Sequence, residues 1–322
     1  KAEGKTISAR GGATTITQTQ AVTYTSGPAA TLTVTGVADP VTAGAAANVV
    51  VTALDEFGNV ATGYTGTIAF TSSDAQAVLP ADYTFVAGDN GTKTFASGVT
   101  LKTAGDQSVT ATDTVTGTIT GSQTGITVNA AAANTLTVAG ITDPVVAGTA
   151  SNVVITALDE FGNVATLYTG TIAFTSTDAQ AVLPANYTFV AGDSGTKTFT
   201  SGVTLKTVGE QTVTATDTVT GSITGAQTAI TVTPAAATKL TVAGITDPVT
   251  AGVASDVVVT ARDDFNNVAT GYVGTIAFTS TDPQAVLPAN YTFVAGDSGT
   301  KTFTGGVTLK TVGEQTVTAT DT

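Results

Sequence analysis

The sequence predicts an all-β chain built of tandem β-sandwich domains, arranged as beads on a string. The first observation is a repeat: the stretch VVVTALDEFGN at Val49–Asn59 returns as VVITALDEFGN at Val153–Asn163 and as VVVTARDDFNN at Val257–Asn267. The spacing is 104 residues both times. The second observation is that short alternating strands are separated by turn residues every ~8–12 residues, which is the pattern of a two-sheet sandwich. The third is that no segment has helical periodicity.

A repeat of 104 residues is long enough to bury its own core, whereas repeats of about 20–50 residues must stack to be stable. We therefore expect three domains, at residues 31–134, 135–238 and 239–322. Residues 1–30 precede them as an N-terminal strand segment, which is either the end of a preceding domain or a donor strand. Because the chain begins with Lys1 and not with Met, we expect it to be a processed or excised piece of a longer protein.

About seven strands are expected in the first repeat. The turn signals between them are Asp39-Pro40, Glu56–Asn59 and Asp89-Asn90-Gly91, and Asp82–Val86 is expected to be irregular. The strands are expected at Thr31–Thr35, Asn48–Asp55, Thr65–Thr71, Lys93–Phe95, Val99–Lys102, Gln107–Thr112 and Gly117–Val128.

Comparison of the three copies indicates which face of the second strand is buried. Leu54 and Leu158 are replaced by Arg262 in the third copy, and an unpaired arginine does not lie in a core. The neighbouring side chains on the other face should therefore point inward. The expected core positions are Val49, Val51, Ala53, Ile68, Phe70, Phe85, Phe95, Val109 and Ala111, with Val153, Ile155, Ala157, Val257, Val259 and Ala261 in the later copies.

Composition excludes several classes of function. The chain has no Cys, His, Met or Trp, so it offers no disulfide framework, no thiolate and no imidazole. Its net charge is −13 and it has no basic cluster, so a nucleic-acid partner is not expected. No run of 18 apolar residues appears, so membrane insertion is not expected either.

The acidic turn that ends the second strand is the best metal candidate. Calcium binds six to eight oxygen ligands, and each copy of this turn offers carboxylates and an amide. The alternative, which we favour, is that these side chains cap their own turn, because the loop supplies too few ligands. Acids such as Asp39, Asp143 and Asp247 could add ligands from a neighbouring domain. The calcium candidates are Asp55, Glu56, Asn59, Asp159, Glu160, Asn163, Asp263, Asp264 and Asn267. No other cofactor is expected.

Other recurring residues carry weaker signals. Asn90, Asn186 and Asn290 lie in glycosylation sequons, although a match of three residues is not specific. Lysines that recur at 102, 206 and 310 could form isopeptide staples, but such side chains usually extend into solvent. Tyrosines at 64, 168 and 272 could line a binding surface, or they could be packing residues. Paired carboxylates for glycoside hydrolysis would need a cleft, which Thr-rich sandwich edges do not suggest.

The two ends of the chain are complementary. The third repeat stops at Thr322 and lacks the counterpart of Val219–Lys239, which includes the final strand. The N-terminal segment contains a stretch, Gln20–Val34, that aligns with Thr124–Val138. Lys5–Arg10 and Thr14–Thr25 predict two strands joined by glycines, with the strand-donor candidates Ile16, Val22 and Tyr24 on one face. One explanation is that one subunit donates this strand to the open third domain of the next. The other is that the chain is a segment of a longer tandem array, and this explanation needs no new contact.

The motifs VTALDEFGN, TGTIAF, GTKTF, SGVTLK and QTVTATD together resemble bacterial Ig-like repeats of the invasin and intimin type. The features shared with that family are Asp55, Gly58 and Asn59 in the turn, Phe70 in the next strand, and the late strand Gly105–Ala111. The resemblance covers residues 31–322 and departs from the family pattern at Asn266, where the third copy lacks the glycine. It implies Ig-like sandwiches in a large extracellular or cell-surface protein, where they serve as spacer or adhesive stalk.

Two functions follow as hypotheses. The first is a non-enzymatic extracellular structural protein, a spacer, stalk or fibre-forming subunit whose partners are identical subunits or further repeats of the same chain. It could polymerise head-to-tail into a filament by donor-strand complementation. The alternative is an adhesin repeat region that binds a glycan or a surface receptor in cell adhesion. The sequence contains only 6% aromatic residues, which favours the first hypothesis.

Overall fold

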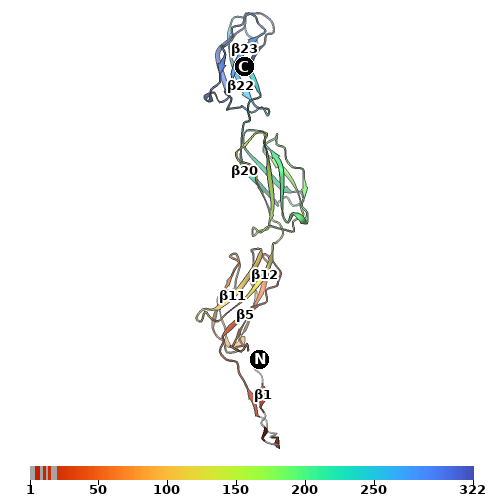
Figure 1. Ribbon diagram of the computed structural model, residues 1–322, viewed down its shortest axis with the longest axis vertical. Helices are drawn as coiled ribbons and strands as arrows, with labels where there is room; N and C mark the ends of the chain where they lie inside the picture. Colours follow the sequence, from red (N-terminus) through yellow and green to blue (C-terminus); the bar gives the residue numbers. More distant parts are fainter. Residues whose placement is uncertain (1–3, 8–9, 12–13, 16–19) are drawn as a thin grey trace. The chain divides into compact units, whose positions relative to one another are not determined.

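The computed structural model describes residues 4–7, 10–11, 14–15 and 20–322, with side chains from Val22 onward (Figure 1). The chain divides into two compact units, each described here by itself. The first comprises Lys1–Asn134 with Ala157–Tyr168, and the second comprises Thr135–Thr156 with Thr169–Thr322. Within the described residues, no helix is long and apolar enough to cross a membrane.

The first repeat is a β-sandwich of a three-stranded and a five-stranded sheet. The strand order is β10-β7-β5 in the smaller sheet and β6-β12-β11-β8-β9 in the larger one. The strands are β5 (Thr31–Thr35), β6 (Val41–Thr42), β7 (Ala46–Leu54), β8 (Thr67–Ser72), β9 (Tyr83–Thr84), β10 (Thr92–Thr100), β11 (Gly105–Asp113) and β12 (Thr120–Asn129).

The second repeat has the same two sheets, ordered β13-β15-β18 and β14-β20-β19-β16-β17. Its strands are β13 (Thr135–Ala139), β14 (Val145–Val146), β15 (Ala150–Leu158), β16 (Thr171–Ser176), β17 (Tyr187–Thr188), β18 (Thr196–Thr204), β19 (Gly209–Asp217) and β20 (Thr224–Thr233).

The core positions inferred from the Arg262 substitution are confirmed. Val49, Val51 and Ala53 are fully buried in β7, and the equivalent residues of β15 and of the third repeat are buried as well. Leu54, Leu158 and Arg262 are all only half-buried. Alternation along a pleated strand places successive side chains on opposite faces, so one arginine in one copy is enough to orient the strand in all three.

The aromatic core has an inner and an outer part. Phe85 is 1% exposed, whereas Phe70 and Phe95, both expected in the core, are only partly buried at its edge. Their rings meet edge to face with centroids 5.0 Å apart. Such a contact stabilises the sandwich rim while the aliphatic residues fill the centre.

Several local details differ from the sequence-based expectation. Strand β9 lies within Asp82–Val86, which is expected to be irregular, and β6 lies where no strand is expected. The segments Lys93–Phe95 and Val99–Lys102, expected as two strands, form the single strand β10 with a register shift between Phe95 and Val99. The bulge is held by the side chain of Asn48, whose Oδ1 accepts the backbone N–H of Ser97 at 2.8 Å. The expected turn at Asp89 begins as a three-residue 3₁₀ helix in each copy: η1 (Ala87–Asp89), η2 (Ala191–Asp193) and η3 (Ala295–Asp297).

The third repeat is an open sandwich with two three-stranded sheets, β21-β22-β25 and β24-β23-β26. Residues 239–322, all of them described, contain no counterpart of β12 or of β6, which pairs with it. Its strands are β21 (Lys239–Ala243), β22 (Ala254–Arg262), β23 (Thr275–Ser280), β24 (Tyr291–Thr292), β25 (Thr300–Thr308) and β26 (Val317–Asp321).

The missing neighbour shortens the last strand. In the first repeat, Gly105–Gln107 pair only with β12, and β8 pairs only with Val109–Asp113. β26 correspondingly keeps only the residues that pair with β23. Apolar side chains that are buried in the closed sandwiches become half-buried here, namely Leu240, Val242, Val317 and Ala319.

The N-terminal segment forms a hairpin ahead of the first repeat. β1 (Gly4–Ile7) pairs antiparallel with β4 (Gln20–Thr23), and β2 (Arg10–Gly11) pairs with β3 (Thr14–Thr15). Of the strand-donor candidates, Ile16 lies outside the described residues. Val22 is half-buried and Tyr24 is 54% exposed.

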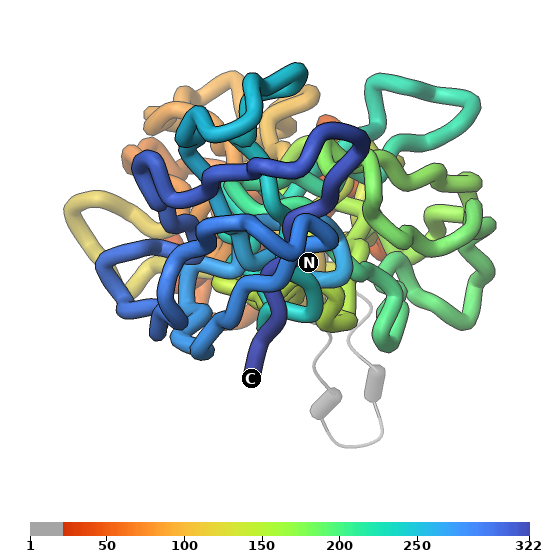
Figure 2. The backbone as a smooth tube through the Cα atoms, turned by 90° about the horizontal axis from the view of Figure 1, so that it is seen from above, coloured from red at the N-terminus to blue at the C-terminus, as the bar shows by residue number. Residues whose placement is uncertain are grey.

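The connections between β11 and β12 and between β19 and β20 protrude from their sandwiches, as the yellow and green loops of Figure 2 show. Val115 and Val219 at their tips are 91% and 90% exposed. Substitution of either valine should therefore leave the packing of its sandwich unchanged.

The orientation of the second strand predicts a contrast between two substitutions in β15. Leu158→Arg reproduces the third copy and should change the free energy of unfolding by less than about 0.5 kcal/mol. Ile155→Ala should cost about 2–5 kcal/mol, because it removes fully buried methyl groups from the core. Native-state hydrogen exchange of the β15 amides measures both. Equal destabilisation by the two changes would contradict the assignment of the faces.

Candidate functional site

One aspartate organises the acidic loop, the name used here for residues 55–59, 159–163 and 263–267. In the second copy, Asp159 Oδ1 accepts the backbone N–H groups of Phe161 at 2.9 Å and Asn163 at 2.8 Å. Asp159 Oδ2 accepts the N–H of Ala131 and the side-chain amide of Asn163, at 2.9 and 2.8 Å. A single carboxylate thus ties its own loop to the linker that enters the repeat.

The other two copies repeat this arrangement. The linker N–H of Gly27 donates to Asp55 Oδ2 at 3.0 Å, and that of Ala235 donates to Asp263 Oδ2 at 3.2 Å. Asn266, where the third copy departs from the glycine, keeps a left-handed φ of 75° and donates its N–H to Asp263 O at 3.1 Å. Asparagine tolerates this conformation, so the turn is conserved in geometry.

Hydrogen bonding sets the charge state of these aspartates. The side-chain amide of Asn59 is the main cause that lowers the pKa of Asp55 to about 2. Burial by itself would raise the pKa of Asp159, but the hydrogen bonds from Asn163, Ala131 and Phe161 outweigh it and hold that pKa below its ordinary value. The loop is therefore built around an ionised carboxylate.

The amide of Asn163 joins the acidic loop to the preceding repeat, which lies in the same compact unit. Its Nδ2 donates to Lys102 O at 2.7 Å, and its Oδ1 accepts the N–H of Ala104 at 2.8 Å. The amide nitrogen and the amide oxygen of Asn163 are thus both hydrogen-bonded to the backbone that follows β10. This pairing imitates one rung of a β-ladder.

The aromatic ring of the loop completes the contact. A side-chain carbon built at Gly44 would lie 2.6 Å from the ring of Phe161, so any larger residue there would require the phenyl group to move. Lys102 Nζ lies 5.8 Å from the ring centroid, within cation–π range. We name the whole contact the clasp, and we name Gly44, Lys102 and Ala104 its receiving surface.

The clasp recurs in the second compact unit between the third and second repeats. Asn267 Nδ2 donates to Lys206 O at 2.7 Å, and its Oδ1 accepts the N–H of Val208 at 3.0 Å. The ring of Phe265 lies against Gly148, where an added side-chain carbon would approach to 2.5 Å. The Nζ of Lys206 lies 5.7 Å from the ring centroid.

Only one of the carboxylates in each acidic loop points into this arrangement. Asp55, Asp159 and Asp263 are 4%, 1% and 0% exposed, whereas Glu56, Glu160 and Asp264 are exposed. Among the residues that the structure describes, no group of three or more acidic side chains could hold a metal ion. The calcium candidates therefore meet as one carboxylate and one amide per loop, with the carboxylate oxygens bonded to N–H donors.

Two of the acids considered as additional ligands, Asp39 and Asp143, have roles inside their own repeats. Asp39 Oδ1 accepts the N–H of Thr127 at 3.0 Å, and Asp143 Oδ1 accepts that of Thr231 at 2.9 Å. These bonds tie the loop after the first strand to the last strand in the first two repeats.

Sequence reasoning missed a second set of buried aspartates. Asp74 is 3% exposed and accepts the N–H groups of Gln76, Lys102 and Thr103 as well as the hydroxyl of Thr103. It thereby holds the turn after β10, which contributes Lys102 and Ala104 to the receiving surface. Asp178 and Asp282 make the same bonds. Their recurrence at the repeat period was the available signal.

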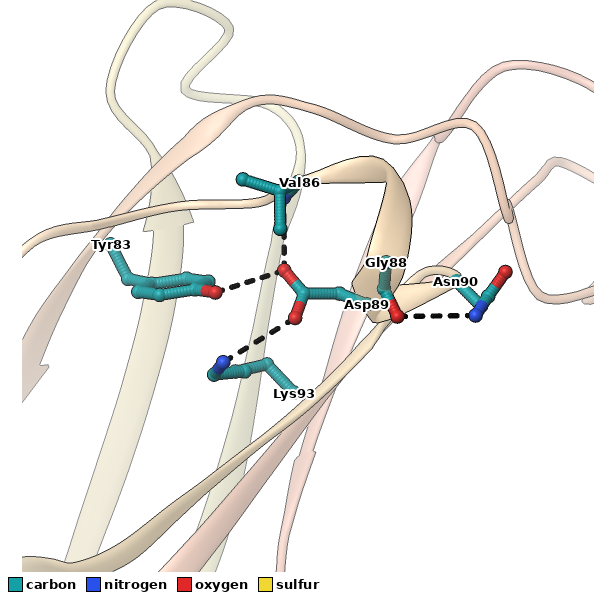
Figure 3. A network of polar contacts seen from close by, with 6 residues as sticks. All are labelled: Tyr83, Val86, Gly88, Asp89, Asn90 and Lys93. Atoms are coloured by element: carbon teal, nitrogen blue, oxygen red, sulfur yellow. Dashed lines mark hydrogen bonds and ion pairs between the residues drawn. The ribbon is translucent and has the colours of Figure 1, made fainter.

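A third aspartate holds the 3₁₀ helix (Figure 3). Asp89 Oδ2 accepts the hydroxyl of Tyr83 at 3.0 Å and the N–H of Val86 at 2.9 Å, while Oδ1 pairs with Lys93 Nζ at 3.4 Å. Asn90, next in the chain, is exposed and donates its amide to Gly88 O at 3.2 Å. The other sequon asparagines, Asn186 and Asn290, are also exposed.

The recurring tyrosines pack inside the sandwich. Tyr64 and Tyr168 are 9% and 8% exposed, and the hydroxyl of Tyr64 donates to Asp113 Oδ2 at 2.5 Å. Burial, and then this hydrogen bond, raises the pKa of Tyr64 above its ordinary value. In the open third repeat, burial beside Asp321 raises the pKa of Tyr272 to about 12. They form no exposed aromatic patch in the closed repeats.

The similarity of this chain to known proteins is limited to solved structures. No protein-family model matches the chain, and a search of curated proteins finds no match. Similar solved structures include FdeC, an Escherichia coli adhesin, at 20% identity and a TM-score of 0.43, covering 92% of this chain and 95% of that one. Invasin, a bacterial integrin-binding protein, has 20% identity and a TM-score of 0.33, covering 90% and 56%. InvD of Yersinia pseudotuberculosis has 20% identity and a TM-score of 0.34, covering 87% and 83%.

The chain spans about half the length of that invasin structure. Its paired three- and five-stranded sheets are tandem Ig-like β-sandwiches, as expected from the sequence.

Loss of the clasp should loosen one junction without unfolding a repeat. Phe161→Ala removes the ring that lies on Gly44, so we expect faster hydrogen exchange and proteolysis in the linker at residues 130–134. Phe57→Ala is the matched control, because Phe57 occupies the same loop position but is 79% exposed. Equal linker protection in both variants would show that the ring does not hold the junction.

Calcium should leave stability unchanged. A site with a dissociation constant of about 1 mM, as in extracellular modules, would stabilise the fold by about 1.4 kcal/mol at ~10 mM calcium. We expect no such gain, because N–H groups occupy both oxygens of Asp159. Thermal unfolding with calcium and with a chelator measures this. A calcium-dependent rise in Tm that Glu160→Gln removes would contradict it.

Proposed function

We propose that this chain is a non-enzymatic structural protein of the cell exterior, a spacer, stalk or fibre subunit made of tandem Ig-like domains. We divide it into an N-terminal strand segment at 1–30 and domains at 31–134, 135–238 and 239–322. The observation that carries the proposal is the clasp, made in the same way at two successive junctions. A contact that joins the ends of successive repeats suits a spacer or stalk.

The use of the carboxylates supports a structural role. The buried aspartates of the acidic loop, of the turn after β10 and of the 3₁₀ helix all accept hydrogen bonds from backbone groups. These carboxylates are engaged in structural hydrogen bonds and are not free to act as a general acid or base. The extracellular or cell-surface location accords with the resemblance of the motifs to invasin and intimin repeats.

An adhesin that used the recurring tyrosines for a glycan or receptor is less well supported. Tyr64 and Tyr168 are buried, and carbohydrate and protein ligands are usually held by exposed aromatic side chains. The buried hydroxyl of Tyr64 is engaged by Asp113. We therefore place adhesive binding second.

The finer part of the proposal is polymerisation by strand donation. The edge of β26 lacks the neighbour that β11 and β19 have, and the side chains beneath it are only half-buried. Residues Thr14–Thr25 of one subunit would supply that neighbour to the Gly252–Thr322 region of the next. Val22 and Tyr24 stand one period before Ile126 and Val128, which are 1% and 2% exposed in β12. An open edge above a half-exposed core accepts such a strand.

Donation requires that β4 exchange its partner. In the present structure β4 pairs with β1, a contact between two four-residue strands. An added strand in the third repeat would pair along β26 as β12 pairs along β11, over seven residue pairs. It would also complete the burial of the half-buried side chain of Val22, which gains part of the about 1.5–3 kcal/mol that full burial of such a side chain contributes. The exchange is therefore favoured by both backbone pairing and apolar burial.

Substitution of the donor strand tests the proposal in the full chain. Val22→Asp places a charge where Ile126 is buried, and it should abolish long assemblies in negative-stain images and size-exclusion chromatography. Thr23→Asp is the matched control, since Thr127 at the equivalent position is exposed, and it should leave them intact. A wild-type chain that stays monomeric, with fast hydrogen exchange in β26, would refute strand donation and leave the spacer function standing.

A further inference from the structure

The chain carries one half of a clasp at each end of the described array. Phe57, in the acidic loop of the first repeat, is 79% exposed, whereas Phe161 and Phe265 are partly buried. At the other end, nothing lies within 4 Å of a side-chain carbon built at Gly252, the equivalent of Gly44 and Gly148. Val312 there is 90% exposed, while Val208 beneath the second clasp is 39% exposed.

The receiving surface of the third repeat is already formed. Gly252 has a left-handed φ of 84°, compared with 81° and 83° at Gly44 and Gly148. Its N–H donates to Leu309 O at 2.8 Å, as Gly44 does to Leu101 O and Gly148 to Leu205 O. Asp282 holds the following turn through the N–H groups of Lys310 and Thr311. The surface therefore needs no rearrangement before it meets a ring.

The first repeat presents its loop in the matching register. The linker N–H of Gly27 is bonded to Asp55, as Ala131 is to Asp159 and Ala235 is to Asp263. A strand taken from residues 20–24 would thus be followed by the same number of residues, and by the same anchored linker, as β12 or β20. The acidic loop at residues 55–59 would then lie on the third repeat as the acidic loops of the second and third repeats lie on the repeats before them.

We propose that the acidic loop of the first repeat docks on the surface formed by Gly252, Lys310 and Val312 of a second copy of this chain. The ring of Phe57 lies on Gly252 and under the ammonium group of Lys310, which repeats the clasp between subunits. This inference rests on the head-to-tail assembly proposed above. It adds a second, separate contact, because the docking residues lie outside the donated strand.

The proposed contact is selective: it pairs the acidic loop of a first repeat with the Gly252 surface of a third repeat. A side chain at position 252 would force the ring to move, because a side-chain carbon built at the two internal clasps approaches the ring to 2.5 and 2.6 Å. Local opposite charge favours the pairing as well, because Lys310 would meet a loop that carries Asp55 and Glu56. Two first-repeat ends or two third-repeat ends present no such match.

Energy transfer between labelled full-length chains tests the docking. The chain has no cysteine, so Thr62→Cys and Glu314→Cys each give a single labelling site at an exposed residue, outside the acidic loop and the receiving surface but close in the chain to one of them. Mixing donor-labelled and acceptor-labelled copies should give energy transfer that rises with concentration. Phe57→Ala should weaken this association by about tenfold or more, as expected for removal of a central aromatic anchor.

Further variants separate the docking from strand donation. Gly252→Asn, which keeps the left-handed backbone but adds a side chain, should match the loss caused by Phe57→Ala. Val115→Ala, at an exposed hairpin tip, should have no effect. Association that Val22→Asp abolishes but Phe57→Ala leaves unchanged would overturn the docking and keep strand donation. Loss with Phe57→Ala alone would keep the docking and overturn donation, and no transfer at all would overturn both.

Discussion

The structure depends on one ionised aspartate per repeat that gathers N–H groups from two places at once. Asp159 is 1% exposed and accepts donors from its own loop and from the linker before it. A carboxylate so buried is stable only when its oxygens are fully hydrogen-bonded. The loop and linker are therefore fixed together, and that fixes where the Asn163 amide and the Phe161 ring point.

Buried aspartates that accept backbone hydrogen bonds also explain how this acidic chain, which has no cysteine, holds its turns. Asp74 organises the turn that becomes the receiving surface, and Asp159 organises the loop that lands on it. The clasp thus joins two segments that are each held by a carboxylate of their own repeat. Because each half is ordered before contact, little further conformational entropy is lost when the halves meet. Receiving surface and loop behave as preformed parts.

The sequence could predict the sandwich but not what its loops contact. Strand Thr31–Thr35 and the buried face of Val49, Val51 and Ala53 follow from alternation and from one arginine, which are local signals. The partner of Asn163 is 59 to 61 residues away, in another repeat. Alternation cannot indicate which loop of a sandwich meets its neighbour. The recurrence of a phenylalanine and a glycine at one period was visible, but it also suits turn and core roles.

The geometry of the anchored linker also explains which linker residues can vary. Only a backbone N–H of Gly27, Ala131 or Ala235 is used, so the side chain at this position is not specified. A proline there would remove the donor and leave the buried aspartate short of one hydrogen bond. Prolines do occur next to it, at Pro28 in the first linker and Pro234 in the third. The linker is thus constrained at one backbone atom, which accounts for the different compositions of three linkers that join the same kind of repeat.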